Sequence, residues 1–405
     1  MATCCRLLLQ CDWQVALRET DGKAWVALQD LSDSAAKPTL RGQLINRGMS
    51  ATGLPYVEGS NGFSVKNVSK DSLHVCYNDE ASNRFAPSEI NFQSIAAAFT
   101  SIHDKKKSVI CLDVTNGGLG VSSSSDGTMK VWQTDTGEVR RDLVEHVGDV
   151  YTCRFFPSGI VVLSGGADLR LKVWSVETGK CAATFIGHRG AVLDTAIVER
   201  GRNIVSCSRD GSAKLWDCSQ QMCLDTFEGM AGSVNGISVG VTENSLDLGQ
   251  PDKPPGEKEV LTEGKMLLMA CESNSFLSYG LQSRKKIFHY ECSDAVNCCT
   301  FLSENTAVCG TQNGKLSIID LRNYNVPLKE FKTSNSAIES LYPHRGGFFT
   351  SAHDGSCHYV NNQYDSYLSL TGPDCDPVYR VVCNNNYIFT ACRDGHIRKY
   401  RLNIP

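Results

Sequence analysis

Short apolar runs separated by tight-turn residues recur along most of this chain. In the clearest stretch, Ser206–Trp216, an apolar run leads into the turn Asp210-Gly211, and apolar residues then alternate with polar ones. Two such runs joined by Asp-Gly predict a β-hairpin, because glycine adopts the backbone conformation that a tight turn needs. Ser122–Trp132 and Ser164–Trp174 share this pattern, with the aspartate six residues before the tryptophan in all three. The hairpin is therefore a repeated unit.

The turn residue of this hairpin recurs about every 40 residues along the rest of the chain. The positions that we align with Asp210 are Asp126, Asp168, Asn274, Asn313, Asp354 and Asp394. One longer step contains an insertion, about 241–265, whose prolines and charged residues predict a mobile loop. Seven units of four short strands each predict an all-β fold, a seven-bladed β-propeller.

The beginning of the chain lacks the repeat. We expect residues 1–85 to form a small, mostly β N-terminal domain with one short helix, and residues 86–405 to form the propeller. The chain ends directly after the third strand of the last unit. The missing fourth strand should come from within residues 84–103, which would close the ring with both ends of the propeller sequence in one blade.

Composition narrows the classes of function. There are 44 acidic and 40 basic residues, which give a net charge of −4. This balance predicts no nucleic-acid binding. No apolar run is long enough to predict a membrane-spanning helix. The 19 cysteines are scattered without a C-x-x-C motif, so we expect small buried residues in a reducing compartment rather than disulfides, a metal site or a cofactor site. This predicts a cytoplasmic and also nuclear protein.

The repeat resembles the WD40 family over about residues 90–405. In that family, tryptophan, serine, histidine and aspartate form a buried hydrogen-bonded tetrad in each blade, which satisfies polar groups that would otherwise be costly to bury. The resemblance assigns structural tetrads in three units: His188, Ser206, Asp210 and Trp216; His146, Ser164, Asp168 and Trp174; and Ser122, Asp126 and Trp132, with His103 in a longer loop. The same three residue types also form hydrolase triads. We predict no catalytic residues, because the set recurs from unit to unit and no G-x-S-x-G motif accompanies it.

The later units keep the spacing but lose the tetrad. In unit four, Asn274 and Gly280 stand where the aspartate and the tryptophan are expected, and unit five has Asn313 and Ile319. These blades should depend on apolar packing instead.

One face of the predicted ring collects the Asp-Gly turns and the loops that enter each first strand. We call it the top face. Exposed polar residues there are candidates for contact with a protein partner, because their mixed charge suits a polar protein surface. They are Arg209, Arg393, Asp149, Arg189, Asp294, His353, Asp374 and Asp376.

Longer segments carry a narrower resemblance within the WD40 proteins. They are DWQVALR with Trp25, GGLGVSSSSDGTMKVW, RFFPSGIVVLSGGADLRLKVWS, GHRGAVLDTAIVERGRNIVSCSRDGSAKLWDC and TGPDCDPVYRV. Together they are similar to a family of chaperone-like factors that bind ATPase subunits of the proteasome regulatory particle. The resemblance implies a cytosolic factor that assists assembly of the particle's base and restrains its docking to the core particle. We expect the chain to be a monomer by itself.

The alternative function is a substrate receptor of a cullin-type ubiquitin ligase. Such propellers often carry a W-D-x-R sequence after the third strand. Here Trp216-Asp217 is not followed by the arginine, and Asp320-Leu321-Arg322 lacks the tryptophan.

Overall fold

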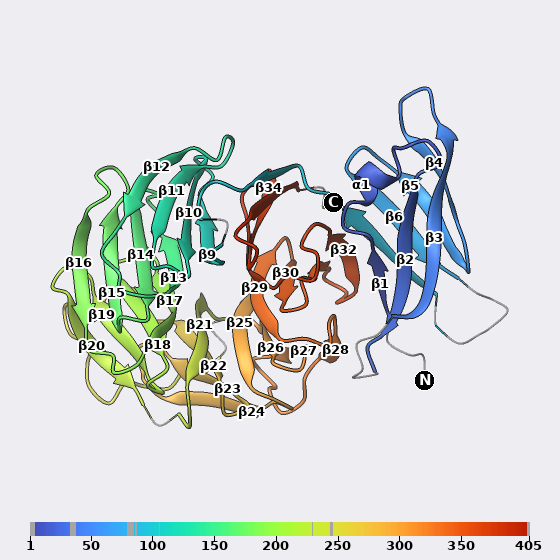
Figure 1. Ribbon diagram of the computed structural model, residues 1–405. Helices are drawn as coiled ribbons and strands as arrows, with labels where there is room; N and C mark the ends of the chain where they lie inside the picture. Colours follow the sequence, from blue (N-terminus) through green and yellow to red (C-terminus); the bar gives the residue numbers. More distant parts are fainter. Residues whose placement is uncertain are drawn as a thin grey trace.

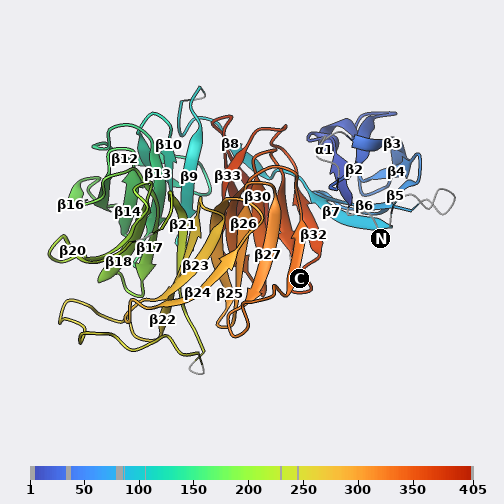
Figure 2. The ribbon, with the colours of Figure 1, turned by 90° about the horizontal axis from the view of Figure 1, so that it is seen from below.

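The computed structural model describes residues 5–32, 38–78, 85, 87–104, 106–228, 230–243 and 246–402. In these residues, β-strands form eight sheets, and a single short helix, α1 (Trp13–Ala16), belongs to the N-terminal domain. Figures 1 and 2 show a ring of sheets with this smaller β-domain beside it. The chain is therefore an all-β, seven-bladed propeller with a β-rich N-terminal domain, as the repeat predicted.

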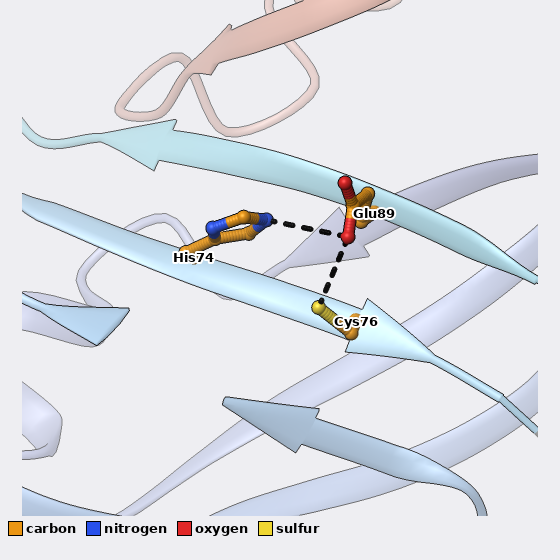
Figure 3. Close-up of side chains that lie close together, drawn as sticks. All are labelled: His74, Cys76 and Glu89. Carbon is orange, nitrogen blue, oxygen red and sulfur yellow. Dashed lines mark hydrogen bonds and ion pairs between the residues drawn. The ribbon is translucent and has the colours of Figure 1, made fainter. Parts of the chain in front are cut away.

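The N-terminal domain packs two sheets around its own core. Four strands pair in the order β1-β2-β3-β4, while β7, β6 and β5 pair antiparallel in the second sheet. Buried side chains such as Leu28, Leu44 and Phe92 come from both sheets. In the second sheet Cys76 lies opposite Glu89, on neighbouring strands (Figure 3). The strands are β1 (Cys5–Leu9), β2 (Lys23–Asp30), β3 (Pro38–Met49), β4 (Pro55–Gly59), β5 (Phe63–Val68), β6 (Ser72–Tyr77) and β7 (Ser88–Gln93).

Blades one to three are four-stranded antiparallel sheets. The second-last residue of each third strand is a buried tryptophan. Alternation along the strands places it on the same face as the serine of the second strand. Blade one contains β9 (Val109–Val114), β10 (Leu119–Ser124), β11 (Met129–Gln133) and β12 (Val139–Leu143). Blade two contains β13 (Val150–Phe155), β14 (Val161–Gly166), β15 (Arg170–Ser175) and β16 (Cys181–Ile186). Blade three contains β17 (Val192–Val198), β18 (Asn203–Ser208), β19 (Ala213–Asp217) and β20 (Met222–Phe227).

Blades four and five have the same strand order without the tryptophan. The second strand of blade four is buried along its whole length, and its core is made by methionine, leucine, phenylalanine and cysteine side chains. Blade four contains β21 (Val234–Val241), β22 (Lys265–Cys271), β23 (Ser275–Gly280) and β24 (Lys286–Glu291). Blade five contains β25 (Val296–Ser303), β26 (Thr306–Thr311), β27 (Lys315–Asp320) and β28 (Lys329–Lys332).

The insertion connects β21 to β22 and extends beyond the ends of these strands (Figure 2). Its described part is bonded to the neighbouring blades. The side-chain amide of Asn203 donates to the Lys258 carbonyl at 3.1 Å and accepts from the Val260 N–H at 2.7 Å. Glu259 pairs with Arg284 of blade four at 2.8 Å. We expected a loop without such contacts. A buried asparagine and an ion pair instead fix this segment against blades three and four.

Blade six joins the two domains. Its strands are β29 (Ile338–His344), β30 (Gly347–Ala352), β31 (Cys357–Val360) and β32 (Ser366–Leu370). The outer strand β32 pairs in parallel with β7, so one seven-stranded sheet runs from the propeller into the N-terminal domain. The boundary that we placed at residue 85 falls between β6 and β7, although β7 pairs with both β6 and β32.

Blade seven contains strands from both ends of the propeller sequence. Its first three strands are β33 (Val378–Cys383), β34 (Tyr387–Cys392) and β35 (Ile397–Arg401), and its fourth is β8 (Ala97–Phe99). Phe99 is buried against Trp132 of blade one, with the ring centroids 5.5 Å apart. The fourth strand is thus contributed by a segment that precedes blade one.

Among the described residues, no helix has the length and apolar character needed to cross a membrane.

Candidate protein-interaction face

The turns between the second and third strands form the top face, and glycine allows most of them. Gly127, Gly211, Gly314, Gly355 and Gly395 have φ between +77° and +83°, which a residue with a side chain rarely adopts. In blade two Leu169 takes this place with φ +67°. In blade four the residue with positive φ is Asn274.

The turn of blade four corrects our alignment. Pairing of Ala270 with Phe276 and Met269 with Leu277 centres the hairpin on Ser273. In blade three, Ser206 pairs with Lys214, which centres the hairpin on Asp210. Ser273 therefore occupies the aspartate position, and Asn274 occupies the glycine position. Our alignment of Asn274 with Asp210 was wrong by one residue. We had aligned the two because their side chains are chemically similar, but Asn274 occupies the position that requires a positive φ, which asparagine tolerates.

Blade three contains a complete tetrad. The Trp216 indole N–H donates to Ser206 Oγ at 2.8 Å. His188 lies 2.8 Å from Ser206 Oγ through Nε2 and 2.9 Å from Asp210 through Nδ1. Burial lowers the pKa of His188, so the ring is neutral; Nδ1–H donates to the carboxylate and Nε2 accepts from the serine hydroxyl. Ser206 has no exposed surface, so a substrate has no access to its hydroxyl.

Asp210 also closes its own turn. Its carboxylate accepts from the Arg189 N–H at 2.8 Å and from the Ser212 N–H and hydroxyl at 3.0 and 2.6 Å. Burial acts to raise the pKa of Asp210, but these hydrogen bonds and the one from His188 lower it to about 2. The carboxylate holds both loops of the top face in place.

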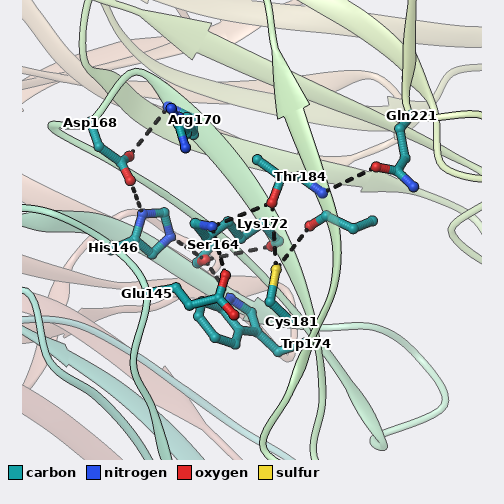
Figure 4. Close-up of polar contacts among 11 residues, drawn as sticks. Glu145, His146, Ser164, Asp168, Arg170, Lys172, Trp174, Cys181, Thr184 and Gln221 are labelled. Atoms are coloured by element: carbon teal, nitrogen blue, oxygen red, sulfur yellow. Dashed lines mark hydrogen bonds and ion pairs between the residues drawn. The ribbon is translucent and has the colours of Figure 1, made fainter.

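Blade two repeats this network (Figure 4). Trp174 donates to Ser164 at 2.8 Å, and His146 links Ser164 at 2.7 Å to Asp168 at 2.9 Å. Lys172 pairs with Glu145 at 3.0 Å beside it.

Blade one uses an additional residue. Trp132 and His103 both bond to Ser122, at 3.1 and 2.7 Å. His103 Nδ1 then lies 3.2 Å from the Thr128 hydroxyl, which donates to Asp126 at 2.6 Å. The loop before β9 is longer than its counterparts and places His103 further from the turn aspartate, so the Thr128 hydroxyl bridges His103 and Asp126. Burial lowers the pKa of His103 to about 4.

Blades six and seven use arginine as the partner of the turn aspartate. Asp354 lies 2.9 Å from Arg6 of the N-terminal domain and 2.8 Å from the Ser334 hydroxyl. Burial acts to raise the pKa of Asp354, but the Arg6 charge and its serine hydrogen bonds lower it to about 2. In blade seven Asp394 pairs with Arg398. We expected the later units, these two included, to depend on apolar packing in place of the tetrad. Both blades have apolar cores, and their turn aspartates are in ion pairs in addition.

Replacing Arg6 by alanine should lower the free energy of unfolding by about 3 kcal/mol, because it leaves the Asp354 carboxylate without its buried cation. The matched control is Arg47→Ala. Arg47 pairs with Glu58 on the exposed surface of the same domain, and its loss should cost less than about 1 kcal/mol. Urea denaturation of the two variants checks this. Equal decreases in the free energy of unfolding would show that the ion pair of Arg6 with Asp354 does not stabilise the contact between the two domains.

Several top-face candidates contact other side chains of the chain rather than solvent alone. Arg393 pairs with Asp376 at 2.8 Å, and His353 with Glu339 at 2.8 Å. Arg209 lies 5.9 Å from the ring centroid of Tyr151. The remaining candidates are exposed or half-buried in the loops entering the first strands: Asp149, Arg189, Asp294 and Asp374. Asp374 also lines a cavity of about 410 Å³ between the N-terminal domain and blade six.

The centre of the ring contains charged residues that our sequence reasoning missed. A central cavity of about 600 Å³ is lined by Arg154, Arg380, Asp113 and Asp194. Asp194 pairs with Arg154 at 3.1 Å and accepts from the Ile237 N–H at 3.3 Å, while Asp113 accepts from the Phe155 N–H at 2.8 Å. These bonds connect the first strands of blades one to four. The signal was available, since each charge interrupts an apolar first strand.

The four-stranded blades and the tryptophan–serine–histidine–aspartate networks define a WD40-repeat β-propeller. The family model described as "WD domain, G-beta repeat" matches residues 98–133, 137–175 and 179–217. Over 399 residues the chain is 52% identical to proteasomal ATPase-associated factor 1 of Gallus gallus and 51% identical to that of Homo sapiens, covering 98% of each chain. It is 37% identical to the probable proteasomal ATPase-associated factor 1 of Dictyostelium discoideum, covering 98% of this chain and 96% of that one. The chain belongs to the proteasomal ATPase-associated factor 1 family.

Proposed function

We propose that this chain is a non-catalytic adaptor that binds ATPase subunits of the proteasome regulatory particle. It would assist assembly of the particle's base and restrain docking of the particle to the core particle. The observation that carries the proposal is similarity over 98% of the chain to relatives named for association with proteasomal ATPases. The serines of the three sets, Ser122, Ser164 and Ser206, have no exposed surface, which supports a structural rather than catalytic role for the sets.

The top face is the surface that we propose for the ATPase. Networks in blades one to three hold its loops rigid, so partner binding there loses little conformational freedom. Arg189 and Arg209 are exposed, and within the described residues neither guanidinium is in an ion pair. Both cations are therefore free to meet acidic groups of a partner, where they would raise the association rate and the specificity.

The geometry decides which variants test this surface. Exchanging the charges of Arg393 and Asp376 together would rebuild an ion pair of reversed polarity, since these two residues contact each other. We therefore choose Arg189→Glu with Arg209→Glu. The control is Lys180→Glu, an exposed cation at the β15–β16 turn, on the opposite end of a blade.

Capture of proteasomal ATPase subunits from a cell extract by the double variant should fall by about tenfold, because acidic groups would then face glutamates. The Lys180→Glu variant should capture as much as the unmodified chain. Undiminished capture by a folded double variant would remove the top-face assignment. Mass spectrometry of the captured proteins tests the function itself: cullin adaptors without ATPases would favour the ubiquitin-ligase alternative.

We also propose that the chain acts as a monomer in the cytoplasm and the nucleus. Its many buried cysteines support a reducing compartment. Light scattering of the purified chain and imaging of a tagged chain in cells test these two statements.

A further inference from the structure

Three side chains with different metal-binding atoms meet on the second sheet of the N-terminal domain (Figure 3). His74 and Cys76 are two residues apart on β6, so they share one face of the strand. Glu89 lies directly opposite Cys76 on β7. Glu89 Oε2 is 3.8 Å from His74 Nε2 and 3.8 Å from Cys76 Sγ, and the three ligand atoms lie within 4.8 Å of one another.

We propose that His74, Cys76 and Glu89 form a Zn²⁺ site, with water as the fourth ligand. Zinc binds imidazole nitrogen, thiolate sulfur and carboxylate oxygen at about 2.0–2.3 Å in tetrahedral geometry, which separates neighbouring ligands by about 3.4–3.6 Å. Two of the observed separations exceed this range by only a few tenths of an ångström. The third separation, between the His74 nitrogen and the Cys76 sulfur, is within 4.8 Å, so side-chain rotations bring all three atoms to one ion.

A positively charged group already lies beside Glu89, where we place the metal ion. The Lys66 ammonium group contacts Glu89 Oε2, and that contact must break before Glu89 can coordinate the metal. The Lys66 side chain is 58% exposed, so it can turn into solvent. Binding also replaces the S–H bond of Cys76 with a sulfur–zinc bond, and the thiol proton passes to water.

The site would act on the connection between the domains. A metal held by β6 and β7 crosslinks two strands at Cys76 and Glu89. Strand β7 is also the partner of β32 in blade six. Zinc should therefore stabilise the strand through which the N-terminal domain is joined to the propeller.

Sequence reasoning predicted no metal site because it relied on the spacing of cysteines. Here the ligands are a single cysteine, a histidine two residues before it, and a carboxylate on the next strand. Only strand register shows that they converge.

The test is titration of the full-length, metal-free chain with Co²⁺, which reports thiolate coordination by a charge-transfer absorption band, and with Zn²⁺ by calorimetry. We expect one ion per chain. His74→Ala, Cys76→Ser and Glu89→Gln should each weaken binding by at least about tenfold, since even indirect partners of a metal contribute about that much. Lys66→Met should strengthen it, because the competing cation is gone.

The matched control is Cys375→Ser, which removes an exposed cysteine elsewhere in the chain and should leave the cobalt band unchanged. Circular dichroism verifies that each variant is folded. An absent thiolate band, or zinc affinity equal in the unmodified chain and in Cys76→Ser, would overturn the site. The Lys66→Met variant keeps the proposal testable if a ligand variant fails to fold, because unchanged affinity in it would contradict the shared position of ammonium and metal.

Discussion

Replacing Asp210 by alanine should lower the free energy of unfolding by about 3 kcal/mol or more. The variant loses hydrogen bonds to a carboxylate, each of which contributes about 1.5–3 kcal/mol. It also leaves the buried His188 N–H with the Ser212 hydroxyl, 3.5 Å away, in place of a charged acceptor. The backbone N–H groups of Arg189 and Ser212 lose their acceptor as well. Urea denaturation followed by tryptophan fluorescence measures the change.

Asp126→Ala is the matched control for Asp210→Ala. Asp126 occupies the same turn position in blade one, but its bonds go to Thr128, and His103 retains the Thr128 hydroxyl as a partner. Because Asp126 is exposed, water replaces part of what its hydrogen bonds contribute, and we expect a loss of about 1 kcal/mol. Similar losses in the two variants would mean that the histidine–aspartate contact adds no stability of its own.

The pH dependence provides a second readout of the Asp210 effect. The folded-state pKa of Asp210 is about 2, below the usual value of about 3.9 for an unfolded chain. Its ionised form therefore stabilises the fold above pH ~4, and this contribution is lost as the pH falls from about 4 toward 2. The difference between the unmodified chain and Asp210→Ala should shrink over that interval.

The sequence pattern was sufficient for features that depend on local spacing. In blade three, the tryptophan follows the turn aspartate by six residues, and the alternation of side chains along a strand then places Ser206 and Trp216 on the same face. The hairpins and tetrads of blades one to three could therefore be predicted from this spacing. The seven-bladed ring followed as well, because a single four-stranded unit cannot bury both of its faces.

Partners that are distant in sequence left no such pattern. Arg6 reaches Asp354 across most of the chain, and β7 joins β32 in parallel. Neither contact has a fixed spacing that a repeat could show. In blade four, asparagine was selected for a positive φ rather than for its hydrogen bonds, so chemical similarity misplaced the turn. The contacts between the domains and the position of the blade-four turn could therefore not be predicted from the sequence pattern, because they depend on domain docking and on backbone conformation.

Removing β8 should open the ring and destabilise the propeller by at least about 4 kcal/mol. Two shortened chains isolate this strand: one begins at residue 95 and keeps β8, and the other begins at residue 101 and lacks it. Both lack the N-terminal domain, and both keep His103 for the tetrad of blade one. The shorter chain loses the pairing of Ala97–Phe99 with β35 and the buried Phe99 ring, whose removal alone typically costs about 3–5 kcal/mol.

The shorter chain also exposes the edge of β35, and unpaired strand edges promote aggregation. Calorimetry should therefore show one cooperative unfolding transition for the chain that begins at residue 95. The chain that begins at residue 101 should unfold at a much lower temperature and over a broader range. Coinciding transitions would show that closure by β8 adds nothing to stability. If the chain that begins at residue 95 does not fold, Phe99→Ala in the full-length protein measures the same contact, since Phe99 packs on Trp132 across the junction of blades seven and one. The free energy of unfolding of that variant should fall by about 3 kcal/mol, because the contact between the closing blade and blade one is lost.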